Sequence, residues 1–500
     1  MLRLPIILSC TPESISEEEV LGKRTYNVYK KRKKSSPLKR FFAVAVCAAV
    51  VVGAFLLMVK LTGNGDGTDS GSAQSSDGSQ GNVVVPSDSD AQNVIAAPIK
   101  DVEVTSSIDT TNNKLPDEIK NLITGYNEEK YKALGSLVYT SLEDYFDTSD
   151  KYGQMYADFC NTSLKFLIFV RESRAADLSF ETASFEIKVT NVKLSNGVFT
   201  VNYEISEAVD FEFSPVTAYS CGMEVEAKVA KGEDGKYKFV QLAEDTDVNL
   251  LIEEKVMNYL GYDFDEYYLK DMTIPDDFNS TQVLGNILGD LKLEAEKNIT
   301  EQAEQLAKFN AAPSDFAVAA TAEHEYDRDA AVDYAYRWVG TDDIIRNSSF
   351  SDYSSFGGNC QNYVSQCLLA GGIPMDWEGT YEQQWKWFDD YTEYAETAEG
   401  RTPSWSGTEN FYDYCNKNTG DGLVAVTDCN IYSGAVGDVM QYVVDGWSHH
   451  SVIITKIIYD DNGNVVDYLI NSNTTDRVDF PLSAYGYTDI RLIRIVGYND

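Results

Sequence analysis

The sequence predicts a multi-domain α+β protein with an N-terminal transmembrane helix. Three observations lead to this fold class. The chain has 500 residues, which is too long for a single hydrophobic core. An uncharged run of 19 residues, Phe41 to Val59, is long enough to span a bilayer as a helix. Beyond it, segments with helical periodicity are followed by segments that alternate between apolar and polar residues.

The N-terminal segments predict a single-pass protein of the cell membrane. Residues 30–40 read KKRKKSSPLKR and lie directly before the apolar run. By the positive-inside rule, residues 1–40 would form a cytoplasmic basic tail and residues 41–60 the transmembrane helix, with the following domains outside the cell. A cleaved signal peptide is the alternative, and the length of the apolar run argues against it. Residues 61–112 begin with a stretch rich in Gly, Ser and Asp, which predicts a flexible linker.

The charge distribution argues against nucleic-acid binding. The formal net charge is −38, although residues 1–60 are basic, so the remainder of the chain is strongly acidic. Such a body offers no basic groove that could neutralise phosphates.

Residues 113–270 predict an α+β spacer domain. Two helical segments, 114–134 and 141–164, precede alternating segments that suggest an antiparallel meander with Asn-Gly and Gly-Asp-Gly turns. By analogy of fold, helices followed by a curved meander would suit an NTF2-like cone. Cys160 and Cys221 are interpreted as core residues, and residues 271–324 are expected to be a helical linker.

The stretch GGNCQNYVSQCLLAGG, residues 357–372, predicts a cysteine at a helix N-terminus. Cys360, Val364 and Cys367 recur at helical spacing and would share one face, and Gly371 and Gly372 would end the helix. The partial positive charge of a helix N-terminus favours an anion, so we expect a lowered thiol pKa.

A histidine and a polar residue follow this cysteine along the chain. Residues 437–459 predict two strands joined by Asp445-Gly446, and His449 and His450 open the second strand. Adjacent strand residues point to opposite faces, so only one histidine would face Cys360. A third strand, 465–470, is followed by Asn471, Asn473 and Asp476. Cysteine, histidine and a polar orienting group, in this order, are typical of a papain-like site.

Residues 325–500 resemble the "Putative amidase domain" family of bacterial cell-surface proteins. This family is placed in the papain-like clan with CHAP and NlpC-type cell-wall peptidases. The resemblance does not extend to residues 1–320. It rests on YDRDAAVDYA, GGNCQNYVSQCLLAGG, PSW at 403–405, GDVMQY, HHSVIITK and the strand ending SNTTD.

The resemblance implies roles for particular residues. The family's cysteine falls on Cys360, its histidine on His450, and its third polar position on Asn473. Asn359, Gln361 and Trp405 are candidates for binding the substrate or the oxyanion. The chain departs from the family pattern twice, because Asn359 stands where an aspartate is usual and Asn473 stands where a histidine is frequent.

The predicted function is hydrolysis of an amide bond, in peptidoglycan or in cell-surface peptides, by a cysteine amidohydrolase with no cofactor and no metal. The alternative is a domain that has lost activity and serves as a wall-binding or interaction module. A zinc site from Cys360, His449 and His450 lacks suitable spacing and a fourth ligand. Trp385 and Trp387 could line a groove, although core packing is favoured.

Overall fold

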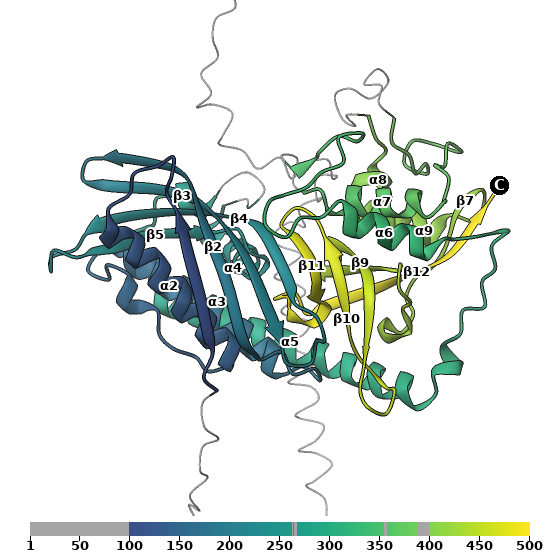
Figure 1. The fold of residues 1–500 in the computed structure, drawn as a ribbon, viewed down its shortest axis with the longest axis horizontal. Coiled ribbons are helices and arrows are strands. Elements are labelled where there is room, and N and C mark those ends of the chain that lie inside the picture. The colour runs from purple at the N-terminus through teal and green to yellow at the C-terminus, as the bar shows by residue number, and fades with distance from the viewer. Residues whose placement is uncertain (1–99, 263, 265–267, 355–357, 389–399) are drawn as a thin grey trace, which may run out of the picture. The chain divides into compact units, whose positions relative to one another are not determined.

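The computed structural model describes residues 100–262, 264, 268–354, 358–388 and 400–500. Within them the fold is α+β, as predicted, and it is built on a 12-stranded mixed sheet. The strand order is β1-β2-β3-β4-β11-β10-β9-β8-β12-β6, with β5 paired to β4 and β7 paired to β12. Figure 1 shows the earlier strands on one side of this sheet and the later strands on the other.

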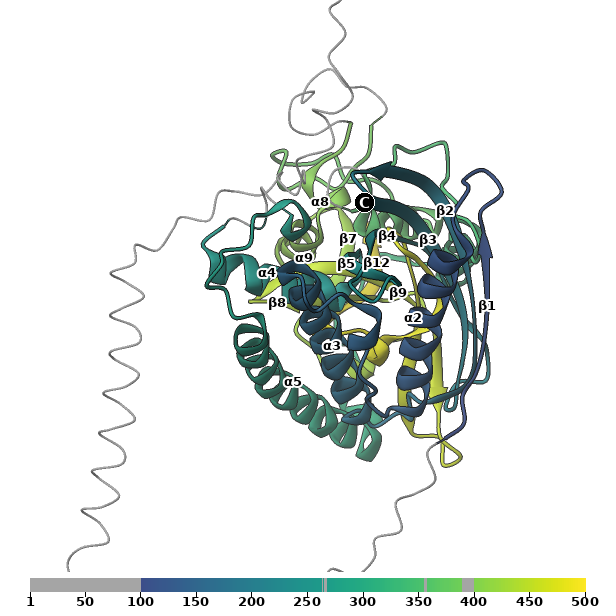
Figure 2. The same ribbon diagram turned by 90° about the vertical axis from the view of Figure 1, so that its left-hand side faces the viewer.

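The first half of the sheet is an antiparallel meander with helices beside it (Figure 2). Alternate residues of its strands are buried, as the polar-apolar alternation of the sequence predicts. Asn196 and Gly197 both have positive φ angles, 51° and 83°, and form the tight turn between β2 and β3. The elements are β1 (Glu103–Asp109), α2 (Asp117–Ser136), α3 (Lys151–Glu172), β2 (Phe180–Ser195), β3 (Val198–Phe211), β4 (Ala218–Lys231), β5 (Tyr237–Glu244), α4 (Asp247–Leu260) and α5 (Ser280–Ala311).

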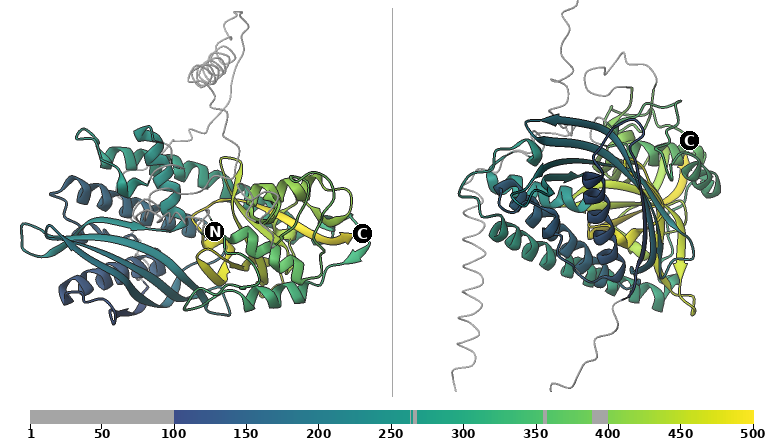
Figure 3. Two further views of the ribbon diagram at one scale, coloured as in Figure 1. Left: turned by 90° about the horizontal axis from the view of Figure 1, so that it is seen from above. Right: turned by 60° about the vertical axis from the view of Figure 1, so that its left-hand side comes forward.

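The second half of the sheet carries a group of short helices, which Figure 3 shows in green beside the yellow strands. Its strands β8, β9 and β10 are antiparallel neighbours, and α6, α7 and α9 pack on β9. The elements are β6 (His324–Glu325), α6 (Arg328–Arg337), α7 (Cys360–Ala370), α8 (Pro403–Ser406), α9 (Thr408–Lys417), β7 (Gly422–Val426), β8 (Val439–Val444), β9 (Trp447–Tyr459), β10 (Val465–Ser472), β11 (Asp476–Pro481) and β12 (Asp489–Asn499).

The two halves join through one antiparallel strand pair. In β11, Asp476, Arg477 and Val478 pair with Cys221, Ser220 and Tyr219 of β4. Helix α5 also contacts both halves, because it packs on α3 and α4 and on β10 and β12. The segments predicted as a spacer domain and a C-terminal domain therefore share one backbone hydrogen-bond network.

The sheet separates two hydrophobic clusters around β8 and β9. Met440, Tyr442 and Val452 belong to the cluster that includes α2, α3 and α5, whereas Val439 and Ile453 belong to the cluster around α6 and α7. Successive strand residues point to opposite faces, so each strand contributes to both clusters. This division decides which side chains of β9 can reach α7.

Two predictions about the N-terminal third need correction. No helix in the described residues is long and apolar enough to cross a membrane, and the segment 41–60 lies outside them. This finding is against the predicted transmembrane helix and the predicted extracellular, membrane-anchored localisation. Helix α5 is amphipathic, with one face buried in the core, and α3 is buried around most of its circumference. The linker predicted over 61–112 also extended too far, because Glu103–Asp109 form β1, which pairs in parallel with β2.

Candidate functional site

Cys360 is the first residue of α7, and the helix ends at Ala370 before Gly371, as predicted. Asn359 occupies the N-cap position. Cys360 is 6% exposed and Val364, Cys367 and Leu368 are fully buried, so the face that carries them packs into the core. The sequence pattern thus predicted both the position of the thiol and the face on which it lies.

Burial controls the state of the Cys360 thiol. Removal from water raises the pKa of Cys360 above its usual value, although backbone N–H groups of Ser451, Gln361 and Cys360 favour the thiolate and oppose this rise. The expected lowering of the pKa by the helix N-terminus was therefore wrong. A short, buried helix start supplies donors to the sulfur, but they compensate only part of the lost hydration.

This environment predicts slow alkylation of Cys360 near neutral pH. We expect the rate with iodoacetamide to rise with pH and to reach half its maximum above the pKa of free cysteine, because the thiolate is the reacting form. Mass spectrometry of the peptide containing Cys360 measures this rate, with glutathione in the same tube as the reference. Fast labelling below pH 7 would contradict the described environment.

His450 lies in β9 directly before Ser451, but its ring is on the face of the sheet opposite the thiol. It stacks on Tyr442 at 6.1 Å and lies 5.7 Å from the ring of Tyr485, between ring centroids. Both tyrosines belong to the cluster on the α3 and α5 side. The residue of β9 that reaches Cys360 is Ser451, through its backbone N–H.

A β-bulge explains why the two adjacent histidines do not lie on opposite faces of the sheet. Tyr442 pairs with His450 and Val443 pairs with Ser448, so His449 is an extra residue in β9. The ring of His449 lies 6.4 Å from that of Tyr487, which belongs to the same cluster as Tyr442. The prediction that the two histidines point to opposite faces is therefore wrong, because the bulge cancels one step of the alternation.

Burial and the charge of Arg477 lower the pKa of His450 to about 3. A folded-state pKa below the unfolded value of about 6.5 means that neutral His450 stabilises the fold above pH 6.5. This contribution is lost as the pH falls from 6.5 towards 3. We expect it to cost about 2 kcal/mol at pH 5. In urea unfolding, the wild type should lose about 2 kcal/mol more unfolding free energy between pH 7 and pH 5 than His450→Gln does. Equal pH dependence in the two proteins would contradict the burial of a neutral ring.

Asn359 and Asn473 form a hydrogen-bonded pair at the start of α7. Asn359 Nδ2 donates to Asn473 Oδ1 at 2.9 Å, and the Asn359 backbone N–H donates to Thr474 Oγ1 at 2.8 Å. Asn359 Oδ1 accepts from the backbone N–H of Tyr353 and from Asn362 Nδ2. The structure therefore brings Asn473 next to the residue before Cys360, but pairs it with Asn359 and not with His450. Neither amide side chain titrates.

Two further predicted binding residues lie in the protein core. Trp405 is fully buried, donates its indole N–H to Asn362 Oδ1 at 2.7 Å, and lies 5.0 Å from the ring of Trp385. The Gln361 side chain is also fully buried and donates to Ser365 Oγ at 3.2 Å. Both side chains are hydrogen-bonded to residues of α7. Trp385 is fully buried, so it is a core residue, as the sequence favoured. Cys415 and Cys429, whose pairing the sequence left open, are both free thiols.

The sequence did not single out Arg346, which holds the loop before α7 together with Asp476. Asp476 is buried and accepts from Arg346 Nη1 at 2.6 Å and from the backbone N–H of Gly340 at 2.8 Å. A small cavity of about 10 Å³ adjoins this ion pair. Its lining includes Arg346, Asp352, Asn359, Tyr363 and Asn473. No sequence motif surrounds Arg346. The only sequence signal for the Arg346–Asp476 ion pair is that Asp476 follows a predicted strand.

Comparisons with known proteins concern the same part of the chain. Residues 325–496 match the family model described as "Putative amidase domain". A protein of Bacillus subtilis (strain 168), described as "Uncharacterized protein YhbB", is 30% identical over 155 residues. The match covers 30% of this chain and 42% of the relative, so the chain spans less than half the length of that protein. The predicted family resemblance is confirmed over residues 325–496, which are called the amidase-type domain below because of this match.

Proposed function

We propose that this domain hydrolyses amide bonds with Cys360 as the nucleophile. The observation that carries the proposal is the position of the thiol, at the first residue of α7 and within reach of the Ser451 and Gln361 backbone N–H groups. Such N–H groups stabilise an anionic sulfur or the oxyanion of a tetrahedral intermediate. The family match supports the class of reaction.

The proposed reaction proceeds through a thioester. The sulfur of Cys360 attacks the amide carbonyl carbon, the carbon–nitrogen bond breaks, and the amine leaves with a proton. Water then attacks the thioester, which releases a carboxylic acid and restores the thiol. In the described arrangement the His450 ring contacts Tyr442 and Tyr485 on the other face of β9, so the thiol proton passes to water or to the leaving nitrogen. We therefore expect slow turnover that increases with pH as the thiol ionises.

The predicted substrates, peptidoglycan and surface peptides, form the first assay panel. The full-length chain is incubated with purified peptidoglycan, with mixed peptides and with a simple acyl amide, and released amines and carboxylates are identified by mass spectrometry. Release of an amine together with its matching carboxylate supports hydrolysis. If no compound is cleaved at any pH up to 10, the proposal of a hydrolase fails.

The Asn359–Asn473 pair favours a second candidate, a domain that binds amides without cleaving them. In the family pattern these positions hold an aspartate and a histidine, which can move protons, whereas two amides cannot. The hydrogen bond between Asn359 and Asn473 places the two positions in direct contact. A loss of both ionisable groups is consistent with a retained scaffold and lost turnover.

Restoring the two ionisable residues separates these candidates. If the site has lost activity, Asn359→Asp with Asn473→His is expected to cleave substrates that the wild type leaves intact, with a gain of about 10²-fold or more from acid–base catalysis. The single variants serve as matched controls. A wild type that is already active, with no gain in the double variant, would rule out the second candidate.

A further inference from the structure

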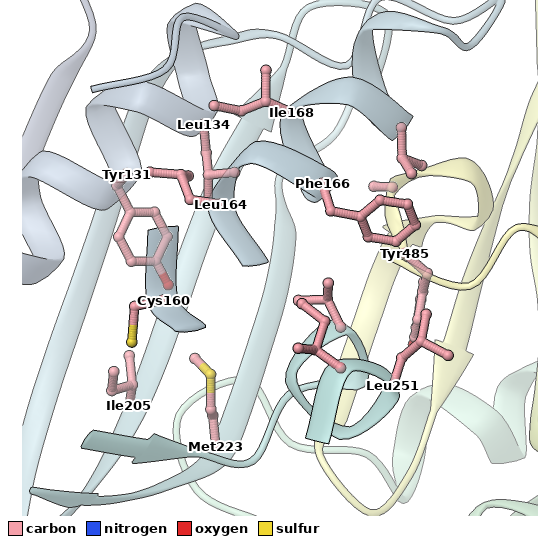
Figure 4. Packing of buried hydrophobic residues seen from close by; sticks show 14 of the residues in the cluster. Tyr131, Leu134, Cys160, Leu164, Phe166, Ile168, Ile205, Met223, Leu251 and Tyr485 are labelled. Carbon is pink, nitrogen blue, oxygen red and sulfur yellow. The ribbon is translucent and has the colours of Figure 1, made fainter. Parts of the chain in front are cut away.

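A second cavity, of about 80 Å³, lies where the two halves of the sheet meet. Its walls come from α2, α3, the starts of β2 and α4, β3, β4, the end of β5 and the segment around β11. Figure 4 labels five of its lining side chains, Tyr131, Leu134, Cys160, Leu164 and Met223. The volume has room for roughly five to eight water-sized groups, which matches the smallest α-amino acids. Cys360 is not among the residues that line it.

Two guanidinium groups line this cavity, that of Arg171, which is buried, and that of Arg477, which is half-buried and hydrogen-bonded to the Tyr485 side chain. Arg171 is 7% exposed, and its one hydrogen bond among the described residues runs from Nε to the Ala484 carbonyl at 3.4 Å. Arg477 stacks over the rings of Phe480 and Tyr485 at 4.4 and 4.0 Å, and its Nη2 lies 3.8 Å from Asp247 Oδ1. Since each guanidinium carries five N–H donors, both have donors left for a bound acceptor. A carboxylate suits their planar geometry.

Carboxylates line the same cavity, and one of them, Glu244, is buried. Glu244 is 7% exposed and bonds through Oε2 to Lys130 Nζ at 2.8 Å. Its other oxygen, Oε1, is buried and has no hydrogen-bond partner among the described residues. Glu207 accepts a hydrogen bond from the Tyr131 hydroxyl. A buried carboxylate oxygen without a donor costs free energy, and a protonated amine would remove this cost.

We propose that this cavity binds a small zwitterionic α-amino acid. Its carboxylate would accept from Arg171 and Arg477, and its ammonium group would donate to Glu244. The charge of the lining supports a zwitterion over an anion such as phosphate, because three cationic side chains face four carboxylates. The cationic residues are Lys130, Arg171 and Arg477, and the carboxylates are Glu207, Glu244, Asp245 and Asp247. A dianion would add to the negative surplus.

The site depends on the junction between the halves. Arg477 and Ser220 both line the cavity and are paired in the β4–β11 register. Arg171 comes from α3, whereas Arg477 and Ala484 come from the amidase-type domain. The amino-acid site is therefore an assembly of both halves and is independent of the reaction proposed for Cys360.

Titration of the full-length chain tests the proposal. Glycine, L-alanine and L-serine are titrated singly by isothermal calorimetry. Acetate and methylammonium are titrated as the two charged fragments of the zwitterion, and inorganic phosphate is titrated as a competing anion. We expect saturable binding of at least one amino acid, and we expect this amino acid to raise the thermal unfolding midpoint. The three comparison compounds should bind at least tenfold more weakly. The proposal fails if no amino acid binds, or if acetate or phosphate binds as tightly.

Variants localise the binding. Arg171→Gln and Glu244→Gln are expected to weaken amino-acid binding at least tenfold, whereas Lys188→Gln, at an exposed ion pair with Asp343, leaves it unchanged. Since buried charge changes can also unfold the chain, Ser220→Val provides a second variant that fills space and keeps every charge. It should lose binding while its circular dichroism stays that of the wild type. A folded Ser220→Val protein with wild-type affinity would place the ligand elsewhere and overturn the proposal.

Discussion

Cys360→Ala is expected to reduce amide hydrolysis by at least about 10³-fold, because no thioester can form without the sulfur. The substitution removes one small side chain at the start of α7 and leaves the Asn359–Asn473 pair in place. We therefore expect circular dichroism and the thermal midpoint to stay close to those of the wild type. The measurement is the initial rate of amine release on any substrate that the panel identifies.

Cys367→Ala is the matched control. Cys367 lies on the same helix and the same face as Cys360, and it is fully buried. Its loss should cost some stability by leaving a small cavity, but it should leave the initial rate within about twofold of the wild type. Equal loss of activity in both variants would show that packing of α7, and not the chemistry of one thiol, controls turnover.

Asp438→Asn is expected to destabilise the fold by about 3 to 5 kcal/mol. The Asp438 carboxylate is fully buried, and its Oδ1 lies 2.7 Å from Arg328 Nη1. Its Oδ2 lies 3.6 Å from Arg494 Nε. Its oxygens also accept from the backbone N–H groups of Ala435 and Ile495, at 2.8 and 2.9 Å. Removing the negative charge leaves two arginines without their buried partner. The shift of the urea unfolding midpoint measures the effect.

Asp117→Asn serves as the control for this prediction. Asp117 forms an ion pair with Lys120 at 3.1 Å, but its side chain is 90% exposed. Exposed pairs contribute little, so its midpoint should match that of the wild type. If Asp438→Asn also unfolds at the wild-type midpoint, the buried cluster does not hold α6 to β8 and β12 as the structure indicates.

Local patterns predicted the elements well. The helix over Cys360–Ala370 followed from apolar spacing and two glycines, and the Asn196-Gly197 and Asp445-Gly446 turns adopt the positive φ angles that such dipeptides favour. The junction between β4 and β11 was not predictable in the same way. Ser220 and Arg477 are 257 positions apart, and nothing in either strand specifies its partner. The register depends on which faces become buried once all strands are assembled.

The sequence could propose residues for the candidate site, but their mutual geometry depends on the assembled fold. The motif placed Cys360 at the start of α7. The resemblance assigned Asn473 as the orienting group of His450, whereas the structure pairs it with Asn359. The alternation rule failed at His449, where a one-residue bulge interrupts the pairing of β9 with β8, and no local signal marks that bulge. His450 keeps the regular alternation with Ser451, and its assignment to Cys360 came from the family resemblance. The thiol pKa was misjudged because burial depends on the packing around α7, which the motif does not contain.

The most direct test of the account is to trap the acyl-enzyme. The full-length chain is mixed with a substrate that it cleaves, quenched in acid within the first turnover, digested, and analysed by mass spectrometry for a thioester. The account predicts the acyl mass on the peptide containing Cys360, and its absence in Cys360→Ala. An acyl group on a different residue, or steady turnover with no acyl group on Cys360 at any quench time, would contradict the assignment of Cys360 as the nucleophile.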